Sequence, residues 1–273
     1  MKKRTKRLII ILALLLIFSL LSWWGFLLQR VDYKVHSDKM PKGLRIVFIS
    51  DLHNCFYGDT DQSQLMDEIK EADPDIIIFG GDILDQWGGQ KYAKRIMDWA
   101  ADRYPCFYTP GNHEQDRDDK EGFYNYVKNS KIKFLVGEHS DITIKGQKIR
   151  VYGVISAYHK EFNKIKKTLD DNYYNILIAH QPEQIDEFLD TGDVKFDLIL
   201  SGHAHGGQWR IPKLLDQGLY APNQGLFPKY TCGMYKYGDT VHIISKGLAR
   251  PARMIFIPRI FNRPEFSVID ISD

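Results

Sequence analysis

Two histidines separated by one residue, His203 and His205, are the most informative feature of the chain. Glycines surround them at Gly202, Gly206 and Gly207. Because glycine has no Cβ, such a segment turns tightly and allows close backbone approach. Imidazole nitrogens are common metal ligands. The run therefore predicts a loop that brings two imidazoles to metal ions, and this chemistry requires carboxylate partners elsewhere in the chain.

Side chains of the required types follow apolar runs earlier in the sequence. Asp51 and His53 follow residues 46–49, Asp82 follows 76–79, Asn112 and His113 follow 106–108, and His180 follows 175–179. In open α/β sheets, ligands bind in the crevice outside the carboxyl ends of the strands. If each apolar run is a strand, all of these side chains meet in one pocket.

The candidate ligands offer carboxylate, amide and imidazole donors but no thiolate: Asp51, His53, Asp82, Asn112, His180, His203 and His205. This donor set suits manganese first, and also iron, zinc or cobalt. Seven ligands exceed the needs of one ion and fit two divalent ions about 3.5–4 Å apart, bridged by a carboxylate. Such a pair clamps the attacking and leaving oxygens of phosphoryl transfer and generates hydroxide from water at neutral pH.

This chemistry requires no protein nucleophile. The sequence accordingly contains neither a Gly-x-Ser-x-Gly elbow nor a Gly-x-x-x-x-Gly-Lys-Ser/Thr phosphate loop. The net charge of +2 includes five basic side chains within the first seven residues. Without those five, 32 basic side chains stand against 35 acidic ones, a net charge of −3. A mildly acidic body argues against specific nucleic-acid binding.

The segments that carry the candidate ligands alternate between strand and helix patterns. Strands are predicted at 45–50, 75–79, 106–108, 175–179 and 197–200, and helices at 61–72, 90–101, 122–129 and from near Pro182. Such alternation is typical of crossover connections between parallel strands.

Elsewhere the pattern changes to short alternating pieces. Residues 142–144 and 148–152 flank a turn and predict a hairpin. Closing strands are expected at 241–245, 254–257 and 266–269, whereas residues 209–237 show no period and suggest a lid or a mobile loop. We therefore expect an α/β protein of the α+β sandwich type, with two mixed β-sheets packed face to face and flanked by helices.

The N-terminal segment predicts a membrane anchor. Residues 8–28 contain no charged side chain, and as a helix they would span about 31 Å, the thickness of a hydrocarbon core. The basic cluster precedes this segment, which favours a cytosolic N-terminus. We expect residues 1–29 to form a basic tail and an uncleaved signal anchor, and residues 30–43 a linker. The protein would then be a single-pass protein of the cell membrane whose body is extracytoplasmic, with cleavage of the anchor as the alternative.

Taken in order, five motifs resemble those of the calcineurin-like metallophosphoesterases: Asp51-x-His53, Gly81-Asp82, Gly111-Asn112-His113-Glu114, His180 and Gly202-His203-x-His205. The resemblance covers roughly residues 44–270 and implies a metallophosphoesterase domain over 44–273. It also implies the fold of that family, a double-layered β-sandwich flanked by helices. This agrees with the mixed pattern of strands and helices described above.

The resemblance also implies roles for the individual residues. Asp51, His53 and His205 would hold the first ion, and Asn112, His180 and His203 the second. Asp82 would bridge the two ions and so take part in catalysis. The catalytic His113 would contact the substrate phosphate and protonate the leaving oxygen, with Asn112 beside it. Glu114 is expected to orient its loop.

Further segments resemble bacterial membrane-associated phosphoesterases: the apolar N-terminus, Ser50–Asn54, 202–208, Tyr220-Ala221-Pro222, 224–230 and 261–264. Some relatives of that subgroup are similar to enzymes that cleave the pyrophosphate of UDP-diacylglucosamine. The resemblance therefore implies hydrolysis of a phosphomonoester, phosphodiester or pyrophosphate bond, on a lipid-linked pyrophosphate or a phospholipid. The alternative is a non-enzymatic metal-binding scaffold at the membrane.

Two basic residues outside the motifs, Lys229 and Arg250, are candidates for neutralising the substrate phosphate. The apolar residues between Trp209 and Phe227 either grip acyl chains or pack the long segment, and packing is the simpler expectation. The histidines outside the motifs, His36, His139, His159 and His242, are expected to be structural or exposed. No pattern in the sequence selects an oligomeric state.

Overall fold

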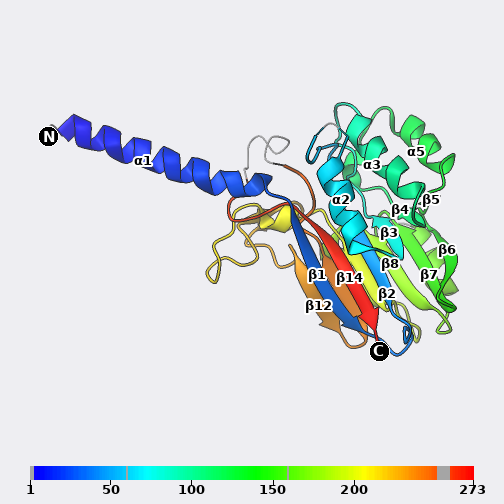
Figure 1. Cartoon of the computed structure of the whole chain (residues 1–273). Coiled ribbons are helices and arrows are strands. Elements are labelled where there is room, and N and C mark those ends of the chain that lie inside the picture. Colours follow the sequence, from blue (N-terminus) through cyan, green and yellow to red (C-terminus); the bar gives the residue numbers. More distant parts are fainter. Residues whose placement is uncertain (1–2, 60, 159, 251–258) are drawn as a thin grey trace.

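The computed structural model describes residues 3–59, 61–158, 160–250 and 259–273. Two six-stranded sheets form the body (Figure 1). In order across the first sheet lie β1 (Gln29–His36), β14 (Glu265–Ser272), β2 (Leu44–Ile49), β3 (Ile76–Phe79), β4 (Cys106–Tyr108) and β5 (Lys133–Phe134). Across the second lie β12 (Gly233–Tyr237), β13 (Thr240–Ile244), β9 (Leu198–Ser201), β8 (Tyr174–Ala179), β7 (Gln147–Val154) and β6 (Glu138–Ile144).

Both sheets are mixed, as the sequence predicted. Strands β2 to β5 run parallel in the first sheet, where β14 pairs antiparallel with β2. Strands β7, β8, β9 and β13 run parallel in the second, while β6 and β12 pair antiparallel at its edges. The β6–β7 pair is the predicted hairpin. The two helix-flanked sheets confirm the expected α+β sandwich.

The core lies between the sheets and beneath the helices on each outer face. Ile46 and Phe48 of β2 pack between the sheets, whereas Val47 and Ile49 pack beneath the helices of the first sheet. A strand buried on both faces reads as a continuous apolar run. The helices α2 (Ser63–Ala72), α3 (Lys91–Ala101) and α5 (Lys120–Lys128) cover the first sheet, and α6 (Lys160–Ile165) and α7 (Ile185–Leu189) cover the second.

Several shorter elements lie between these strands and helices. They are α4 (Asn112–Gln115), the 3-10 turns η2 (Lys166–Thr168), η3 (Pro182–Gln184) and η4 (His205–Gly207), and the pair β10 (Tyr220–Ala221) and β11 (Gly225–Leu226). The expectation that residues 209–237 lack regular structure is therefore wrong for β10, β11 and β12. The strand expected at 254–257 lies outside the described residues.

The segment interpreted as a linker is structured. Residues 29–36 form β1 and pair in parallel with the whole of β14. Their sequence alternates apolar Val31, Tyr33 and Val35 with charged neighbours, a period of two that suits an edge strand. The linker prediction is wrong because this alternation is a strand signal, and its partner lies at the other end of the chain.

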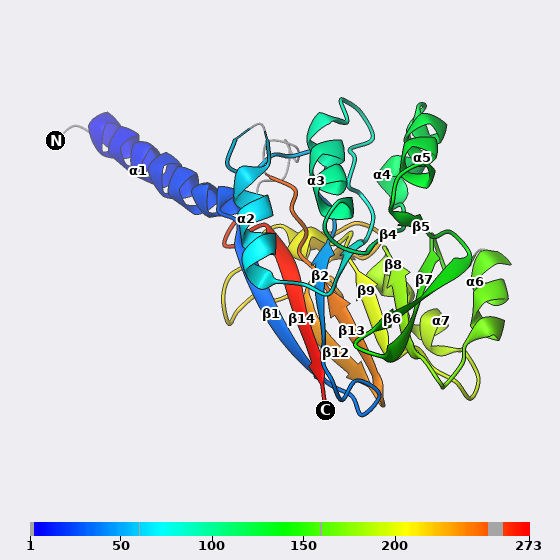
Figure 2. The same cartoon turned by 45° about the vertical axis from the view of Figure 1, so that its right-hand side comes forward.

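Helix α1 (Lys3–Trp23) and the 3-10 turn η1 (Trp24–Phe26) precede β1 and extend away from the body (Figures 1 and 2). The span Arg4–Phe26 is long and apolar enough to cross a membrane. Its large apolar side chains, from Leu8 to Leu20, are exposed where described. The predicted apolar helix is therefore present.

Candidate metal centre

The predicted ligands lie just after the carboxyl ends of strands from both sheets. Asp51 follows β2, Asp82 follows β3, Asn112 begins α4 after β4, His180 follows β8, and His203 follows β9. All seven predicted ligands are buried or half-buried. Since β2 to β4 run parallel to one another, as do β8 and β9, their ends deliver these side chains to one edge of the sandwich.

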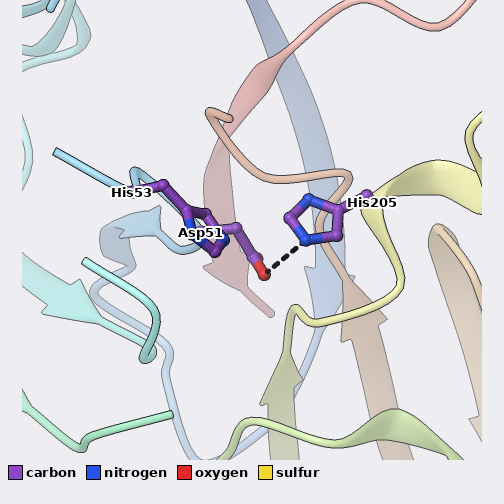
Figure 3. Close-up of side chains that lie close together, drawn as sticks. All are labelled: Asp51, His53 and His205. Carbon is purple, nitrogen blue, oxygen red and sulfur yellow. Dashed lines mark ion pairs between the residues drawn. The ribbon is translucent and has the colours of Figure 1, made fainter. Parts of the chain in front are cut away.

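The ligand atoms form overlapping clusters. The groups Asp51–His53–His205, His53–Asp82–His113 and Asp82–His180–His203 each have one donor atom per residue within 4.8 Å of the others. His180 Nε2 lies 3.0 Å from Asp82 Oδ2, and His53 Nε2 lies 3.8 Å from the same oxygen. Figure 3 shows the first group, in which His205 Nε2 is 3.8 Å from Asp51 Oδ1. Asp82 therefore lies between the two ligand sets, as the bridging role requires.

These residues fit a pair of metal ions. Buried donor atoms make no hydrogen bond with the described residues at Asp51 Oδ2, His53 Nε2 and Asn112 Oδ1, while Asp82 Oδ2 and His180 Nε2 contact each other at 3.0 Å. Leaving buried polar atoms unpaired is costly, so such a concentration at one place calls for a ligand. The donors are oxygens and imidazole nitrogens, the set that suits manganese, iron, zinc or cobalt.

The backbone of the ligand loops is strained. Five ligands have positive φ: Asp51 at 50°, His53 at 48°, Asp82 at 51°, His203 at 68° and His205 at 47°. Non-glycine residues seldom adopt this region, and it often marks functional sites. Hydrogen bonds hold the turns: His203 N donates to Asp51 Oδ1 at 2.9 Å, and His113 N donates to Asp82 Oδ1 at 2.8 Å. One oxygen of each carboxylate thus fixes a neighbouring loop.

Burial and close charges divide the site into charged and neutral groups. Burial raises the pKa of Asp51. Burial acts in the same direction on Asp82, but nearby imidazoles outweigh it, and the pKa of Asp82 lies well below its ordinary value. Burial lowers the pKa of His180, yet Asp82 and Asp51 raise it to about 10. Burial lowers the pKa of His203 to about 3 and also holds that of His205 well below its usual range. His203 and His205 are therefore neutral, the form that binds metal.

His113 lies at the edge of this cluster with a partner on its far side. Its Nε2 is 3.9 Å from Asp82 Oδ2, and its Nδ1 is 3.2 Å from Asp85 Oδ1. Gln86 N donates to the same Asp85 oxygen at 2.9 Å, which fixes the carboxylate. Burial lowers the pKa of His113, but Asp85 and Asp82 more than compensate, so the pKa is raised. The protonated form that a proton donor needs is therefore favoured.

Glu114 joins two ligand loops, as the sequence suggested. Its Oε2 accepts hydrogen bonds from Asp82 N at 2.8 Å and Gly111 N at 2.9 Å. Its Oε1 accepts one from Leu84 N at 2.8 Å. The side chain is fully buried, and its role is to hold the Asp82 loop against the loop that carries Asn112.

Three residues that the sequence did not single out also contact the ligands. Asp85 contacts the ligand His53 at 3.7 Å and also His113. Its position could have been suspected from the sequence, because it lies three residues after Asp82 in the same loop. Asn223, between β10 and β11, places its Nδ2 3.1 Å from His203 Nε2. The buried Arg259 lies 3.4 Å from His205 Nδ1 and donates to Lys246 O at 2.7 Å. Asn223 and Arg259 come from distant segments, so no local pattern marks them.

A family model for the calcineurin-like phosphoesterase domain matches residues 44–207. The chain belongs to this family. The match starts at the first residue of β2 and ends at the last residue of η4, so it contains all seven candidate ligands.

Several similar proteins have names that contain the word metallophosphoesterase. An uncharacterized metallophosphoesterase of Helicobacter pylori (strain J99) is 28% identical over 247 residues, covering 82% of this chain and 61% of that protein. The uncharacterized metallophosphoesterase YkuE of Bacillus subtilis is 27% identical over 263 residues, covering 90% and 86%. A transmembrane protein with metallophosphoesterase domain from Danio rerio is 25% identical over 226 residues, covering 77% and 50%. This calcineurin-like phosphoesterase chain thus spans 61% of the length of its Helicobacter relative.

Lys229 and Arg250, the candidate phosphate contacts, pack against aromatic rings of this calcineurin-like phosphoesterase. The exposed Lys229 places Nζ 4.7 Å from the centre of the Tyr230 ring. The Arg250 guanidinium lies 4.1 Å from the centre of the Tyr57 ring, and Arg250 N contacts Cys55 Sγ at 3.5 Å. Their phosphate-binding role remains a prediction.

Proposed function

We propose that the protein is a membrane-anchored, dinuclear-metal hydrolase of phosphomonoester, phosphodiester or pyrophosphate bonds. The observation that carries the proposal is the convergence of the ligand side chains, among which Asp51, His53 and Asn112 each keep a buried donor atom without a hydrogen bond to the described residues. Asp51, His53 and His205 would hold one ion, Asn112, His180 and His203 the other, with Asp82 between them. Two divalent ions in such a site supply charge neutralisation and lower the pKa of water.

The chain's own residues supply proton transfer and positioning. His113 projects toward Asp82 from the cluster edge and has a raised pKa, so it is suited to donate a proton to the leaving oxygen. Asp85 holds the opposite ring nitrogen and so orients the imidazole. Asn112 and His113 are neighbours in α4, which places an amide and an imidazole together for contact with a phosphoryl group.

A pocket of about 270 Å³ adjoins the centre and supports a polar substrate group. It is lined by Asn112, Gln115, Ile155, Ser156, Tyr158, His180, Gln181 and Gln184. Amide and hydroxyl side chains suit a hydroxyl-bearing head group. Together with the apolar helix, this pocket supports a lipid-linked substrate, such as a phospholipid at an extracytoplasmic membrane surface. A UDP-diacylglucosamine-like pyrophosphate fits the same pocket only if the domain faces the cytosol, because an outward-facing domain would not meet a cytosolic sugar nucleotide.

The test uses the full chain, purified in detergent and loaded with manganese. We expect hydrolysis of p-nitrophenyl phosphate or its bis ester, and Asp82→Asn should abolish turnover because the bridging charge is lost. The control is Asp67→Asn, which changes an exposed carboxylate on α2 and should leave turnover intact. Unchanged activity in Asp82→Asn would contradict the dinuclear mechanism. Metal binding without turnover across a broad phosphoester panel would instead favour the scaffold alternative.

Two further measurements test the finer parts of the proposal. Phospholipids in detergent micelles should be hydrolysed faster than soluble nucleotides, and equal rates would contradict lipid selectivity. A tag at the C-terminus should be accessible to protease from outside intact cells. Protection of that tag would contradict the extracytoplasmic location.

A further inference from the structure

The end of the apolar helix is fixed to the edge of the sandwich that carries the metal centre. In the register of β1 with β14, Gln29 lies opposite Glu265. In the antiparallel register of β14 with β2, Ser267 lies opposite Phe48. Beyond that pair, Glu265 N donates to Gly247 O at 3.0 Å and Leu248 N donates to Ser50 O at 3.1 Å, so residues 247–248 join Glu265 to Ser50, the residue before the ligand Asp51. Because neighbouring backbone segments in a sheet are about 4.8 Å apart, these three steps place the start of β1 roughly 15 Å from the end of β2.

Contacts from the 261–264 segment hold this junction. Arg263 Nε donates to Leu27 O at 3.1 Å, and Gln29 N donates to Pro264 O at 2.9 Å. The rings of Trp24 and Phe261 lie 6.5 Å apart in an edge-on arrangement. These contacts leave no flexible tether between helix and body, so a membrane around α1 would face the edge that carries the metal centre.

The backbone of the segment after β9 runs beside the same junction (Figures 1 and 2), where Arg210 N donates to Ile260 O at 3.0 Å, and several of its apolar side chains are exposed. Leu214 is 79% exposed, Phe227 is 71% exposed and Leu226 is 66% exposed. Ile211 and Trp209 are also exposed. These five residues are called the apolar loop face. Packing of the loop does not explain them, and a group of large exposed apolar side chains marks an interaction site.

The backbone beneath the apolar loop face is ordered by the metal-centre loops. Leu219 N donates to Gly207 O at 2.8 Å, and Phe227 N donates to Leu219 O at 2.8 Å. The β10–β11 pair carries Leu226 and also holds Asn223, whose side chain contacts His203. The exposed face is therefore rigidly coupled to the ligand loops.

We propose that the apolar loop face inserts into the lipid interface and, together with the end of α1, holds the opening of the metal centre against the bilayer. This inference rests on the proposed membrane anchoring. Exposed Lys213 and Lys229 flank Leu214 and Phe227 in the sequence, and lysines beside apolar side chains are typical of interfacial surfaces. Phosphoesters embedded in the membrane would then reach the site without leaving the lipid.

The first test measures insertion directly and needs no activity. In full-length protein with Cys232→Ser, Leu226→Cys carries an environment-sensitive fluorophore, and Thr143→Cys is the matched control. Thr143 is exposed on β6 and pairs with Lys148 at the start of β7, which is the end of the second sheet opposite the metal centre. The other native cysteines, Cys55 and Cys106, are buried. In vesicles of phosphatidylcholine and phosphatidylglycerol, spin-labelled lipids should quench the probe at position 226 and spare that at 143. Equal, weak quenching at both positions would overturn the proposal.

The second test measures the consequence for substrates. The triple variant Leu214→Ser, Leu226→Ser, Phe227→Ser should lose about tenfold in hydrolysis of an acyl-chain nitrophenyl phosphoester in vesicles. It should keep its rate on the water-soluble p-nitrophenyl ester, and Thr143→Ala should keep both rates. Equal loss on both esters would overturn the proposal. If wild type hydrolyses neither ester, the proposed function fails, while the quenching result still decides whether this face enters the membrane.

Discussion

Replacing Glu114 with glutamine should separate the two loops that this carboxylate joins. Three backbone N–H groups point at its two oxygens, two at Oε2 and one at Oε1. A glutamine can keep one oxygen in place, but its NH2 group then faces a backbone N–H, donor against donor. A protonated acid would create the same conflict. Burial and Asp82 raise the pKa of Glu114, yet the three donors require the carboxylate form.

The magnitude follows from the bonds that are lost. A hydrogen bond to a charged group contributes about 1.5–3 kcal/mol, and a buried donor left unpaired costs about 1–3 kcal/mol. Losing one acceptor therefore predicts a decrease of roughly 2.5–6 kcal/mol in the free energy of unfolding for Glu114→Gln. Because one of the joined loops carries Asn112, metal affinity should also fall about 10- to 100-fold.

The assay is guanidinium denaturation followed by tryptophan fluorescence, with manganese affinity and kcat/KM measured in parallel. The control is Glu71→Gln, which changes an exposed carboxylate on α2 and should stay within about 0.5 kcal/mol of wild type. If Glu114→Gln matched this control in stability and metal affinity, the carboxylate would not be the joint between the loops. The reasoning from the three donors would then be wrong.

Two shorter predictions follow. Gly111→Ala should lose metal and activity and unfold more easily by about 1–3 kcal/mol, because its Cβ would lie 2.2 Å from Asp82 Oδ1. The control is Gly122→Ala on α5, where an added Cβ would meet no neighbouring group within 4 Å. The melting temperature of this control should equal or exceed that of the wild type, whereas that of Gly111→Ala should be lower. Burial lowers the pKa of His242 to about 3, so this imidazole favours unfolding as the pH falls below its unfolded value of 6.5. From pH 7 to pH 5, His242→Gln should lose about 2 kcal/mol less stability than wild type in urea titrations; equal losses would contradict this.

Short-range sequence patterns predicted the strands, the helices and the ligands that directly follow the strands. Each ligand follows an apolar strand, and the parallel sheets gather the strand ends at one edge, so strand prediction alone places Asp51, Asp82 and His180 together. The ordered motifs then specified the family. The hairpin and the alternating helices were predicted for the same reason, because hydrophobic periodicity is a short-range signal.

What the sequence did not reveal depends on contacts between distant segments. The β1 strand carries an alternating pattern, but its partner β14 lies more than 200 residues away, and the charged residues between its apolar positions resemble a linker. Arg259 reaches His205 only through the fold. The apolar side chains between Trp209 and Phe227 have no period, so burial of some and exposure of others could not be distinguished before the structure.

Because the ligand loops are strained, bound metal ions should stabilise these loops more than the rest of the fold. Five ligand residues at positive φ cost about 1 kcal/mol or more each, which is large beside a total stability of about 5–15 kcal/mol. Hydrogen bonds such as His203 N to Asp51 Oδ1 offset part of this cost, and bound ions at a thousandfold excess over Kd would add about 4 kcal/mol. Chelation should therefore loosen the loops rather than the sandwich.

Hydrogen exchange can separate these regions. After chelation, amides in residues 50–54, 81–85 and 202–208 should exchange faster, while those of β8 between the buried strands β7 and β9 should stay protected, and manganese should reverse the change. Equal acceleration in β8 would show that the ions support the whole fold. In that case the strain at the ligands would be distributed through the sandwich, and the hydrogen bonds between the loops would not be sufficient to contain it.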